Sequence, residues 1–322
     1  MKKLKIAFIL FIAIGTGSLF AQIDSEPVVV EESVQKVDFA DIHRQALSGR
    51  VELHNIRSFP LAEIFETNKD ITFLSVEDSF ELKSLPENIA DFKSLRTLLI
   101  SGVSLTNFPP GVFEMDGLTT FVYNNSFTRS IPKQIGRLRN LKQLNIERMP
   151  IEQIPKEIGD LINLEGLMIQ ETAGRYSIGG VFFDLAGINH LPKEIGGLAS
   201  LKRLLADKNN LIEIPKEIGS LDKLIIFSAS DNKISTIPAE LFNLKKLENL
   251  LLANNEIEEI SMEVKKLKTL KILNLNHNKL TTLPDAISRL KNLKRLEIKG
   301  NQIPVEQIEK LKKLLPDTEI IY

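Results

Sequence analysis

The chain has 322 residues, of which 43% are hydrophobic and 26% are charged, and its formal net charge is −1. This is the composition of a folded protein, and the absence of a basic excess argues against a nucleic-acid partner. The chain contains no cysteine, which excludes disulfide bonds, thiolate metal sites and a cysteine nucleophile.

The N-terminus has the three-part pattern of a secretory signal peptide over residues 1–21. Three lysines within the first five residues precede an apolar run over residues 6–20, and Ala21 offers a cleavage site before Gln22. The run is shorter than the roughly 20 residues that span a membrane, so we expect no membrane span after cleavage. The alternative is an uncleaved anchor, favoured by Leu19, where a small residue is usual.

Residues 22–37 contain several glutamates and a proline, and we expect a flexible tether there. Residues 38–70 are predicted to form an N-terminal cap and a degenerate first repeat. Apolar residues at helical spacing predict a short helix that ends near Gly49. These residues are Phe39, Ile42, Ala46 and Leu47.

Residues 71–303 repeat the pattern Leu-x-x-Leu-x-Leu, mostly with a period of 23 residues. A looser copy begins at Ile71, and the regular copies begin at Leu95, Leu118, Leu141, Leu164, Leu201, Leu224, Leu247, Leu270 and Leu293. A proline recurs at the equivalent position after most copies, at Pro86, Pro109, Pro132, Pro155, Pro192, Pro215, Pro238 and Pro284. About ten copies at constant spacing indicate a repeat protein, in which stacked strands form a parallel sheet.

One clear unit runs from Leu270 to Pro284, with the sequence Leu-Lys-Ile-Leu-Asn-Leu-Asn-His-Asn-Lys-Leu-Thr-Thr-Leu-Pro. It resembles the leucine-rich repeat family, in the 23-residue class with a Leu-Pro-x-x-Ile-x-x-Leu convex side, and in particular its exported bacterial members. The resemblance covers roughly residues 50–322. It implies an α/β solenoid, a horseshoe with a concave parallel sheet and short helical or irregular convex segments.

An asparagine column divides the repeats into two groups. It comprises Asn209, Asn232, Asn255, Asn278 and Asn301. The earlier repeats have Val103, Ser126, Met149 and Thr172 instead. An inward amide can satisfy the backbone groups of a tight bend, so we interpret this column as structural and expect a more regular C-terminal half.

The step from Leu164 to Leu201 is 37 residues, which places a 14-residue insertion at residues 173–186. The pair Gly179-Gly180 lies between β-forming residues and predicts a hairpin. Insertions in repeats emerge as loops that often bind ligands, although the two phenylalanines could instead pack back over a repeat edge. The candidate binding residues of the insertion are Arg175, Tyr176, Phe182 and Phe183.

The residues between the strand leucines should point outward onto the concave sheet. Five of the nine positions in their central column are apolar, and Leu99 and Val122 should lie one strand spacing, about 4.8 Å, apart. Contiguous exposed apolar area indicates an interaction site, whereas the alternative is half-burial by the curved sheet. The predicted ligand-binding residues are Leu99, Val122, Met168, Leu205 and Leu251 in this column, with Ile226 and Ile272 in the neighbouring column.

Residues 304–322 are predicted to be a C-terminal cap, with a helix after Pro304 and a short strand over residues 318–322. The four histidines are scattered, and no catalytic or metal-binding motif is recognised, so we expect no enzyme, cofactor or metal. The favoured function is an exported, monomeric recognition module for a protein ligand, located in the periplasm, on the outer surface or in the medium. The alternatives are a signalling scaffold like the leucine-rich repeat proteins that bind small GTPases, or a glycan-binding surface protein.

Overall fold

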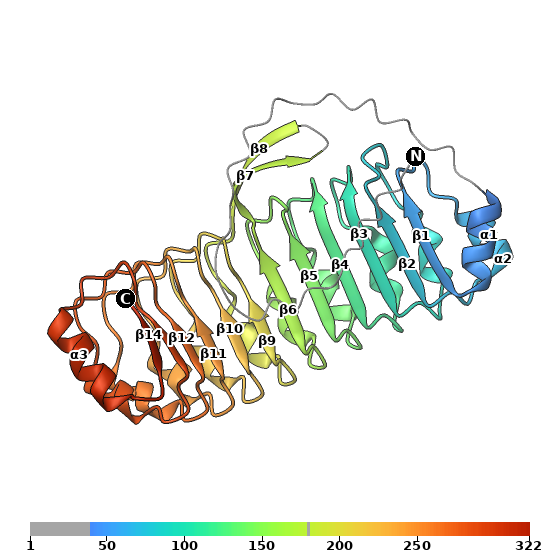
Figure 1. Ribbon diagram of the computed structural model, residues 1–322. Coiled ribbons are helices and arrows are strands. Elements are labelled where there is room, and N and C mark those ends of the chain that lie inside the picture. Colours follow the sequence, from blue (N-terminus) through green and yellow to red (C-terminus); the bar gives the residue numbers. More distant parts are fainter. Residues whose placement is uncertain (1–38, 179–180) are drawn as a thin grey trace, which may run out of the picture. The chain divides into compact units, whose positions relative to one another are not determined.

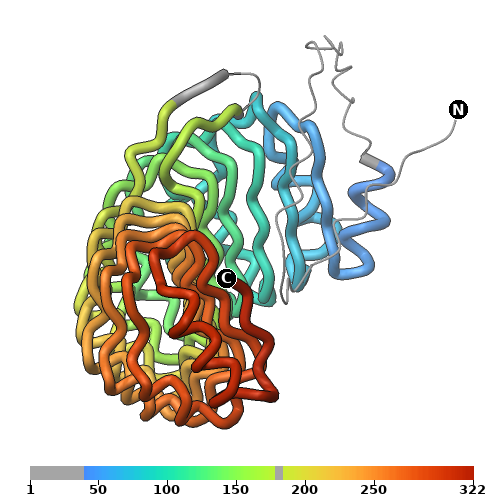
Figure 2. Tube along the Cα trace, turned by 60° about the vertical axis from the view of Figure 1, so that its left-hand side comes forward, coloured from blue at the N-terminus to red at the C-terminus, as the bar shows by residue number. Residues whose placement is uncertain are grey.

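The computed structural model describes residues 39–178 and 181–322 (Figure 1). The predicted signal peptide and tether lie outside these residues. The described chain winds as a coil with one turn for each repeat (Figure 2).

Twelve strands form one parallel sheet in chain order, because each repeat adds its strand beside that of the preceding repeat. The strands are β1 (Arg50–His54), β2 (Phe73–Glu77), β3 (Thr97–Val103), β4 (Thr120–Ser126), β5 (Gln143–Glu147), β6 (Gly166–Gln170), β9 (Arg203–Leu205), β10 (Ile226–Ser228), β11 (Asn249–Leu251), β12 (Ile272–Asn274), β13 (Arg295–Glu297) and β14 (Glu319–Ile321). The solenoid and its parallel sheet are as predicted from the period.

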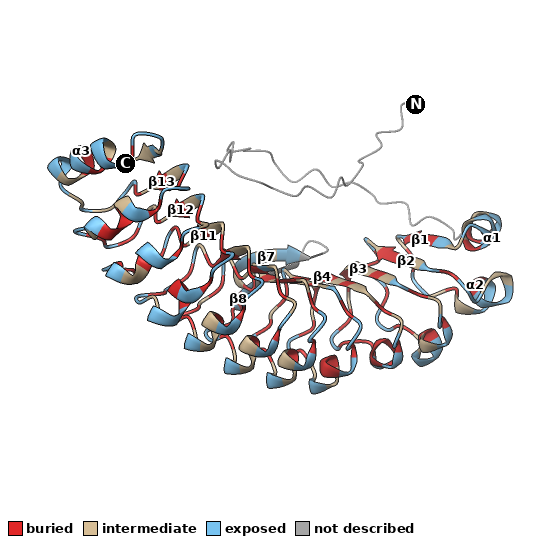
Figure 3. Cartoon of the chain, turned by 90° about the horizontal axis from the view of Figure 1, so that it is seen from below, coloured by how far each residue is buried: buried red, intermediate tan, exposed pale blue. Residues whose placement is uncertain are grey.

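Short 3-10 helices lie on the opposite side of the described repeats, along the outer side of the arc in Figure 3. They are η1 (Glu87–Asp91), η2 (Pro110–Glu114), η3 (Lys133–Arg137), η4 (Lys156–Asp160), η5 (Lys193–Gly197), η6 (Lys216–Ser220), η7 (Ala239–Asn243), η8 (Met262–Lys266) and η9 (Asp285–Arg289). The repeat prolines directly precede these turns, where their fixed φ suits the bend. Before η8 there is no proline, and the Ser261 hydroxyl accepts a hydrogen bond from Glu263 N (3.2 Å). The isoleucine of the convex pattern Leu-Pro-x-x-Ile-x-x-Leu points inward; Ile158, in η4, is an example and is fully buried.

The core is one continuous layer of apolar side chains between the strands and the 3-10 helices. In the repeat that begins at Leu270, the motif residues Leu270, Leu273 and Leu275 are 0–1% exposed. Full burial of one such side chain stabilises the fold by roughly 2 kcal/mol. Since every repeat contributes the same positions, burial between neighbouring repeats is the main source of stability.

Helices close the two ends of the core. At the N-terminal end, α1 (Phe39–Leu47) buries Ile42 and Ala46 but leaves Leu47 63% exposed. A second helix that the sequence analysis missed, α2 (Leu61–Thr67), follows Pro60 and replaces the 3-10 turn in the first repeat. At the other end, α3 (Val305–Leu314) buries Ile308 and Leu311, and β14 pairs with β13.

The asparagine column forms the predicted ladder of buried amides. Asn255 Nδ2 donates to the carbonyls of Ala229 (2.9 Å) and Leu252 (3.2 Å), and Asn255 Oδ1 accepts from Ile234 N (3.0 Å). The amide therefore links its own bend to the preceding repeat. Equivalent bonds are made by Asn232, Asn278 and Asn301.

The earlier repeats satisfy the same bend differently. Tyr123 is fully buried, and its hydroxyl bonds to the hydroxyls of Ser126 (2.9 Å) and Thr128 (2.6 Å). Both of these residues donate to Leu105 O. Tyr123 also packs edge-on against Phe108, with ring centroids 4.8 Å apart. Hydroxyls and aromatic rings thus replace the buried amide in this repeat.

We predict that Asn255→Ala lowers the free energy of unfolding by about 3 kcal/mol, because it leaves the Ile234 N–H and nearby carbonyls buried without partners. Urea unfolding followed by circular dichroism measures the effect. Asn243→Ala, at an exposed asparagine of η7, is the matched control and should leave the midpoint nearly unchanged. Equal midpoints for both variants would contradict a structural role for the ladder.

Candidate binding surface

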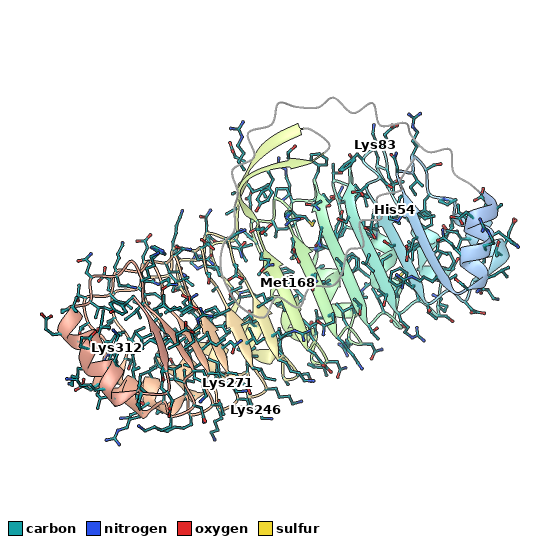
Figure 4. All side chains as sticks on the ribbon, in the orientation of Figure 1. His54, Lys83, Met168, Lys246, Lys271 and Lys312 are labelled. Carbon is teal, nitrogen blue, oxygen red and sulfur yellow. The ribbon has the colours of Figure 1, made fainter. Side chains whose placement is uncertain are left out.

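The central outward column of the sheet forms a continuous ladder in the strand register. Leu99 pairs with Val122, Met168 pairs with Leu205, and Leu251 pairs with Ser228 and Asn274. These predicted residues therefore occupy neighbouring strands on one face, where Figure 4 labels Met168. Side chains at such positions contact their neighbours because adjacent strands are about 4.8 Å apart.

The ladder is half-buried and not fully exposed. All seven predicted residues have intermediate exposure, and Ser228, which lies in the same column, is only 3% exposed. The curved sheet therefore shields these side chains in part, which was the structural alternative to a binding role. Each still presents apolar area to the concave face, so the structure is compatible with both interpretations.

The apolar residues of the ladder form two pairs and one single residue, Leu251. Asn145 separates Val122 from Met168, and Ser228 separates Leu205 from Leu251. In the neighbouring column, Asn249 lies between Ile226 and Ile272. These two isoleucines flank the second half of the ladder and do not pair with each other.

The insertion is an antiparallel hairpin of β7 (Ala173–Ile178) and β8 (Val181–Ala186). It rises from the end of β6, beyond the border of the sheet where the strands end (Figure 1). Thr172 closes its base, because the Thr172 hydroxyl bonds to Asn209 Oδ1 and accepts from Ile188 N (3.1 Å). Arg175 lies opposite Asp184 in the hairpin register. The side chains of Phe182 and Phe183 lie outside the described part of the structure.

A charged cluster that the sequence analysis did not identify lies at the base of this hairpin. The Glu171 carboxylate pairs with Arg148 Nε (2.6 Å) and Lys208 Nζ (3.0 Å), and it also bonds to the Tyr176 hydroxyl of the hairpin. Tyr176 is thus half-buried against the solenoid and bonded to it. We name Arg148, Glu171, Lys208 and Tyr176 the hairpin cluster.

The backbone at the hairpin cluster is in an unusual conformation. Arg148, Glu171 and Lys208 are equivalent residues of successive repeats, and each has a φ between 52° and 55°. This left-handed region is disfavoured for residues with long side chains, and the equivalent residues in several other repeats are asparagine, aspartate or glycine. Charged residues at these left-handed positions are the signal by which sequence reasoning could have found the cluster.

Burial shifts the pKa values of several groups around the hairpin cluster. Burial alone would raise the pKa of Glu171, but the bonds from Arg148 and Lys208 outweigh it and lower that pKa below its ordinary value. Burial, followed by the adjacent Glu171, raises the pKa of Tyr176 to about 12. Burial also raises the pKa of the neighbouring carboxyls Glu147 and Asp207. The base of the hairpin is therefore a partly dehydrated, charged border beside the apolar ladder.

Over residues 39–178 and 181–322, no group of three histidine, aspartate or glutamate side chains is arranged to hold a metal ion. No helix in this same part of the chain has the length and apolar character needed to cross a membrane.

Comparison with known proteins identifies the repeat. The sequence profile of the leucine rich repeat family matches residues 245–303. A leucine-rich repeat ectodomain of the plant receptor kinase GASSHO1 from Arabidopsis thaliana is 29% identical, with a TM-score of 0.60, over 76% of this chain and 29% of that one. Residues 245–303 thus match the leucine-rich repeat family, and the described chain has the leucine-rich repeat fold.

Bacterial leucine-rich repeat proteins are also similar. One from Leptospira interrogans is 28% identical over 85% of this chain and 89% of its own, with a TM-score of 0.43. An internalin from Listeria monocytogenes shares the fold, with 17% identity and a TM-score of 0.53 over 90% of this chain and 91% of its own. This chain spans less than half the length of the plant ectodomains. Comparison with curated proteins gives no match.

Leucine-rich repeat solenoids are typically non-enzymatic modules that bind proteins on the extended surfaces their curvature creates. The apolar ladder of this chain lies on the outward face of such a solenoid's sheet.

We predict that Tyr176→Phe releases the hairpin from the solenoid without lowering global stability, because it removes the bond to Glu171 and leaves the repeat core intact. Hydrogen exchange should quicken for residues 173–178, while the unfolding midpoint stays the same. Tyr322→Phe, at the exposed C-terminal tyrosine, is the control. Unchanged exchange in the hairpin would show that Tyr176 does not hold it.

Proposed function

We propose that this leucine-rich repeat protein is an exported, non-enzymatic recognition module that binds a protein or peptide ligand on its concave face. The observation that carries the proposal is the ladder of half-buried apolar side chains in strand register, with Leu99 beside Val122 and Met168 beside Leu205. Contiguous apolar area that remains accessible is typical of interaction surfaces.

The chemistry of the ladder favours a protein ligand over a sugar. The predicted residues of the ladder are aliphatic or methionine, which pack against apolar side chains, whereas sugar rings generally need aromatic side chains for stacking. The GASSHO1 ectodomain is seen in complex with CASPARIAN STRIP INTEGRITY FACTOR 2, and the plant peptide hormone receptor RGFR1 in complex with RGF2, which supports a protein or peptide ligand here.

The hairpin cluster beside the ladder would orient a bound ligand. Arg148 and Lys208 both pair with Glu171 just beyond the strands that carry Met168 and Leu205, so a ligand that lies along these residues would meet a charged border. We infer that the apolar ladder supplies most of the affinity and that the hairpin cluster fixes the orientation of the ligand.

We predict that Leu205→Asp and Leu251→Asp each abolish ligand capture, because a carboxylate on the ladder would have to be buried without a partner on binding. The full chain and each variant are used to retain proteins from envelope and extracellular material, which are identified by mass spectrometry. The fold should remain cooperative, because both side chains point away from the core. Ile212→Asp, at a 47% exposed residue outside the ladder, is the matched control.

Support requires one or more proteins retained by the wild type and by Ile212→Asp but lost with both ladder variants. Equal retention by all four proteins would exclude the concave ladder as the binding surface.

Export is the part of the proposal that depends on residues 1–21. We predict that the mature protein begins at Gln22, which removes three lysines and changes the net charge from −1 to −4. N-terminal sequencing of the protein from fractionated cells measures this. Intact, uncleaved protein in the cytoplasm would contradict export and favour an intracellular scaffold.

A further inference from the structure

A row of lysines follows the border of the sheet where the strands begin, in the last four regular repeats. In each repeat, the residues two before, one before and one after the first leucine lie at this border. Among the twelve positions, seven are lysine and two are acidic, Asp222 and Glu248. We name the lysines the lysine edge: Lys223, Lys245, Lys246, Lys268, Lys271, Lys291 and Lys294.

The lysine edge is local to these repeats. In the five preceding regular repeats, the equivalent positions number fifteen, and they hold five basic and two acidic residues. Away from this border the last four repeats also hold acidic residues, for example Glu256, Glu258 and Glu259 between β11 and η8. The positive charge therefore gathers on one border of a chain whose net charge is −1.

The charges of the lysine edge are exposed and mostly not neutralised. All seven lysines are exposed, and Lys271 pairs with Glu248 (2.7 Å). For the other six, no ion pair with a described residue is found within 4.0 Å. Figure 4 shows Lys246 and Lys271 at the lower border of the sheet, on the opposite side from the hairpin.

The repeat places these charges in a regular row. Lys245, Lys268 and Lys291 are equivalent residues separated by 23 positions, so their backbones follow the strand spacing of about 4.8 Å. Hydrogen bonds between repeats hold the turns that carry these lysines. Thr269 Oγ1 donates to Lys245 O (2.9 Å), and Asn292 Nδ2 donates to Lys268 O (2.7 Å). A linear row of cations is thus built onto a rigid backbone.

The chemistry of this row fits a linear polyanion better than a protein, a nucleic acid or a membrane. The cores of protein interfaces are depleted in lysine and use apolar or aromatic anchors. In the last four repeats, none of the exposed large apolar side chains of the described chain lies at these border positions; Ile162 occupies one in an earlier repeat. Nucleic-acid binding generally requires an overall basic domain, and membrane binding generally combines charge with an inserted apolar group.

We propose that the lysine edge binds an acidic polysaccharide, with sulfate or carboxylate groups that lie along the repeats. The site is separate from the concave ladder, so the polysaccharide and a protein ligand could be bound at the same time. Recognition is electrostatic and needs no stacking platform, because the row of ammonium groups matches a polymer that repeats its negative charges.

The test measures binding of the full chain to heparin, used as the sulfated probe, by titration calorimetry at low and at moderate salt. The triple variant Lys245→Gln, Lys268→Gln, Lys291→Gln should weaken binding by about tenfold or more at low salt, since each lysine lost near an anionic surface removes a substantial part of the attraction. Wild-type binding should weaken as salt is raised.

The matched control removes the same charge from another periodic column. Lys156→Gln, Lys193→Gln, Lys216→Gln alters three exposed lysines that each begin a 3-10 turn, and it should leave heparin binding unchanged. The second arm of the experiment measures binding of the full chain to anionic vesicles of phosphatidylglycerol and phosphatidylcholine.

The proposal is supported when heparin binds the wild type and the control variant but not the lysine-edge variant. Any of three results overturns it: no heparin binding by the wild type, equal weakening by the two triple variants, or binding to anionic vesicles without binding to heparin.

Discussion

No repeat of this solenoid can cover its own leucines, and this constraint determines the rest of the structure. Leu273 of one repeat is buried only because Leu250 and Leu296 lie beside it on neighbouring strands in register. The parallel sheet and the buried amides follow from the same stacking, since the strands must stay in register for the leucine layer to close. At the two ends of the solenoid no neighbouring repeat covers the core, and the helices α1 and α3 cover it instead.

Those features that depend on one repeat could be predicted from the sequence. The 23-residue period predicted the strands, and the asparagine column that contains Asn255 predicted a buried amide. Features that depend on several repeats could not. Glu171 meets Arg148 and Lys208 across separations of 23 and 37 residues; the period shows that the three positions are equivalent, but not that their side chains pair. The helix α2 was missed because its sequence departs from the repeat pattern.

The two groups of repeats solve the same problem with different chemistry. In the C-terminal repeats, one amide satisfies both a donor and acceptors of the bend, so the column tolerates little change. In the repeat that contains Tyr123, hydroxyls fill this role and a large ring occupies the space of a leucine, packed against Phe108. The ladder residue Val122 lies beside Tyr123 on β4, and Leu99 lies opposite Val122 on β3, so the positions of both depend on this aromatic packing.

Stacking also explains why this fold can carry separate recognition surfaces. The inward positions are constrained by the core, whereas outward positions alter the surface at little cost to stability. On one strand the outward residue Leu251 faces the concave side, and Lys246 lies at the border where that strand begins. Both positions recur in every repeat, so the same side-chain chemistry at equivalent positions forms a row along the solenoid. An apolar ladder and a cationic edge are therefore two independent outcomes of one architecture, and each can change without disturbing the other.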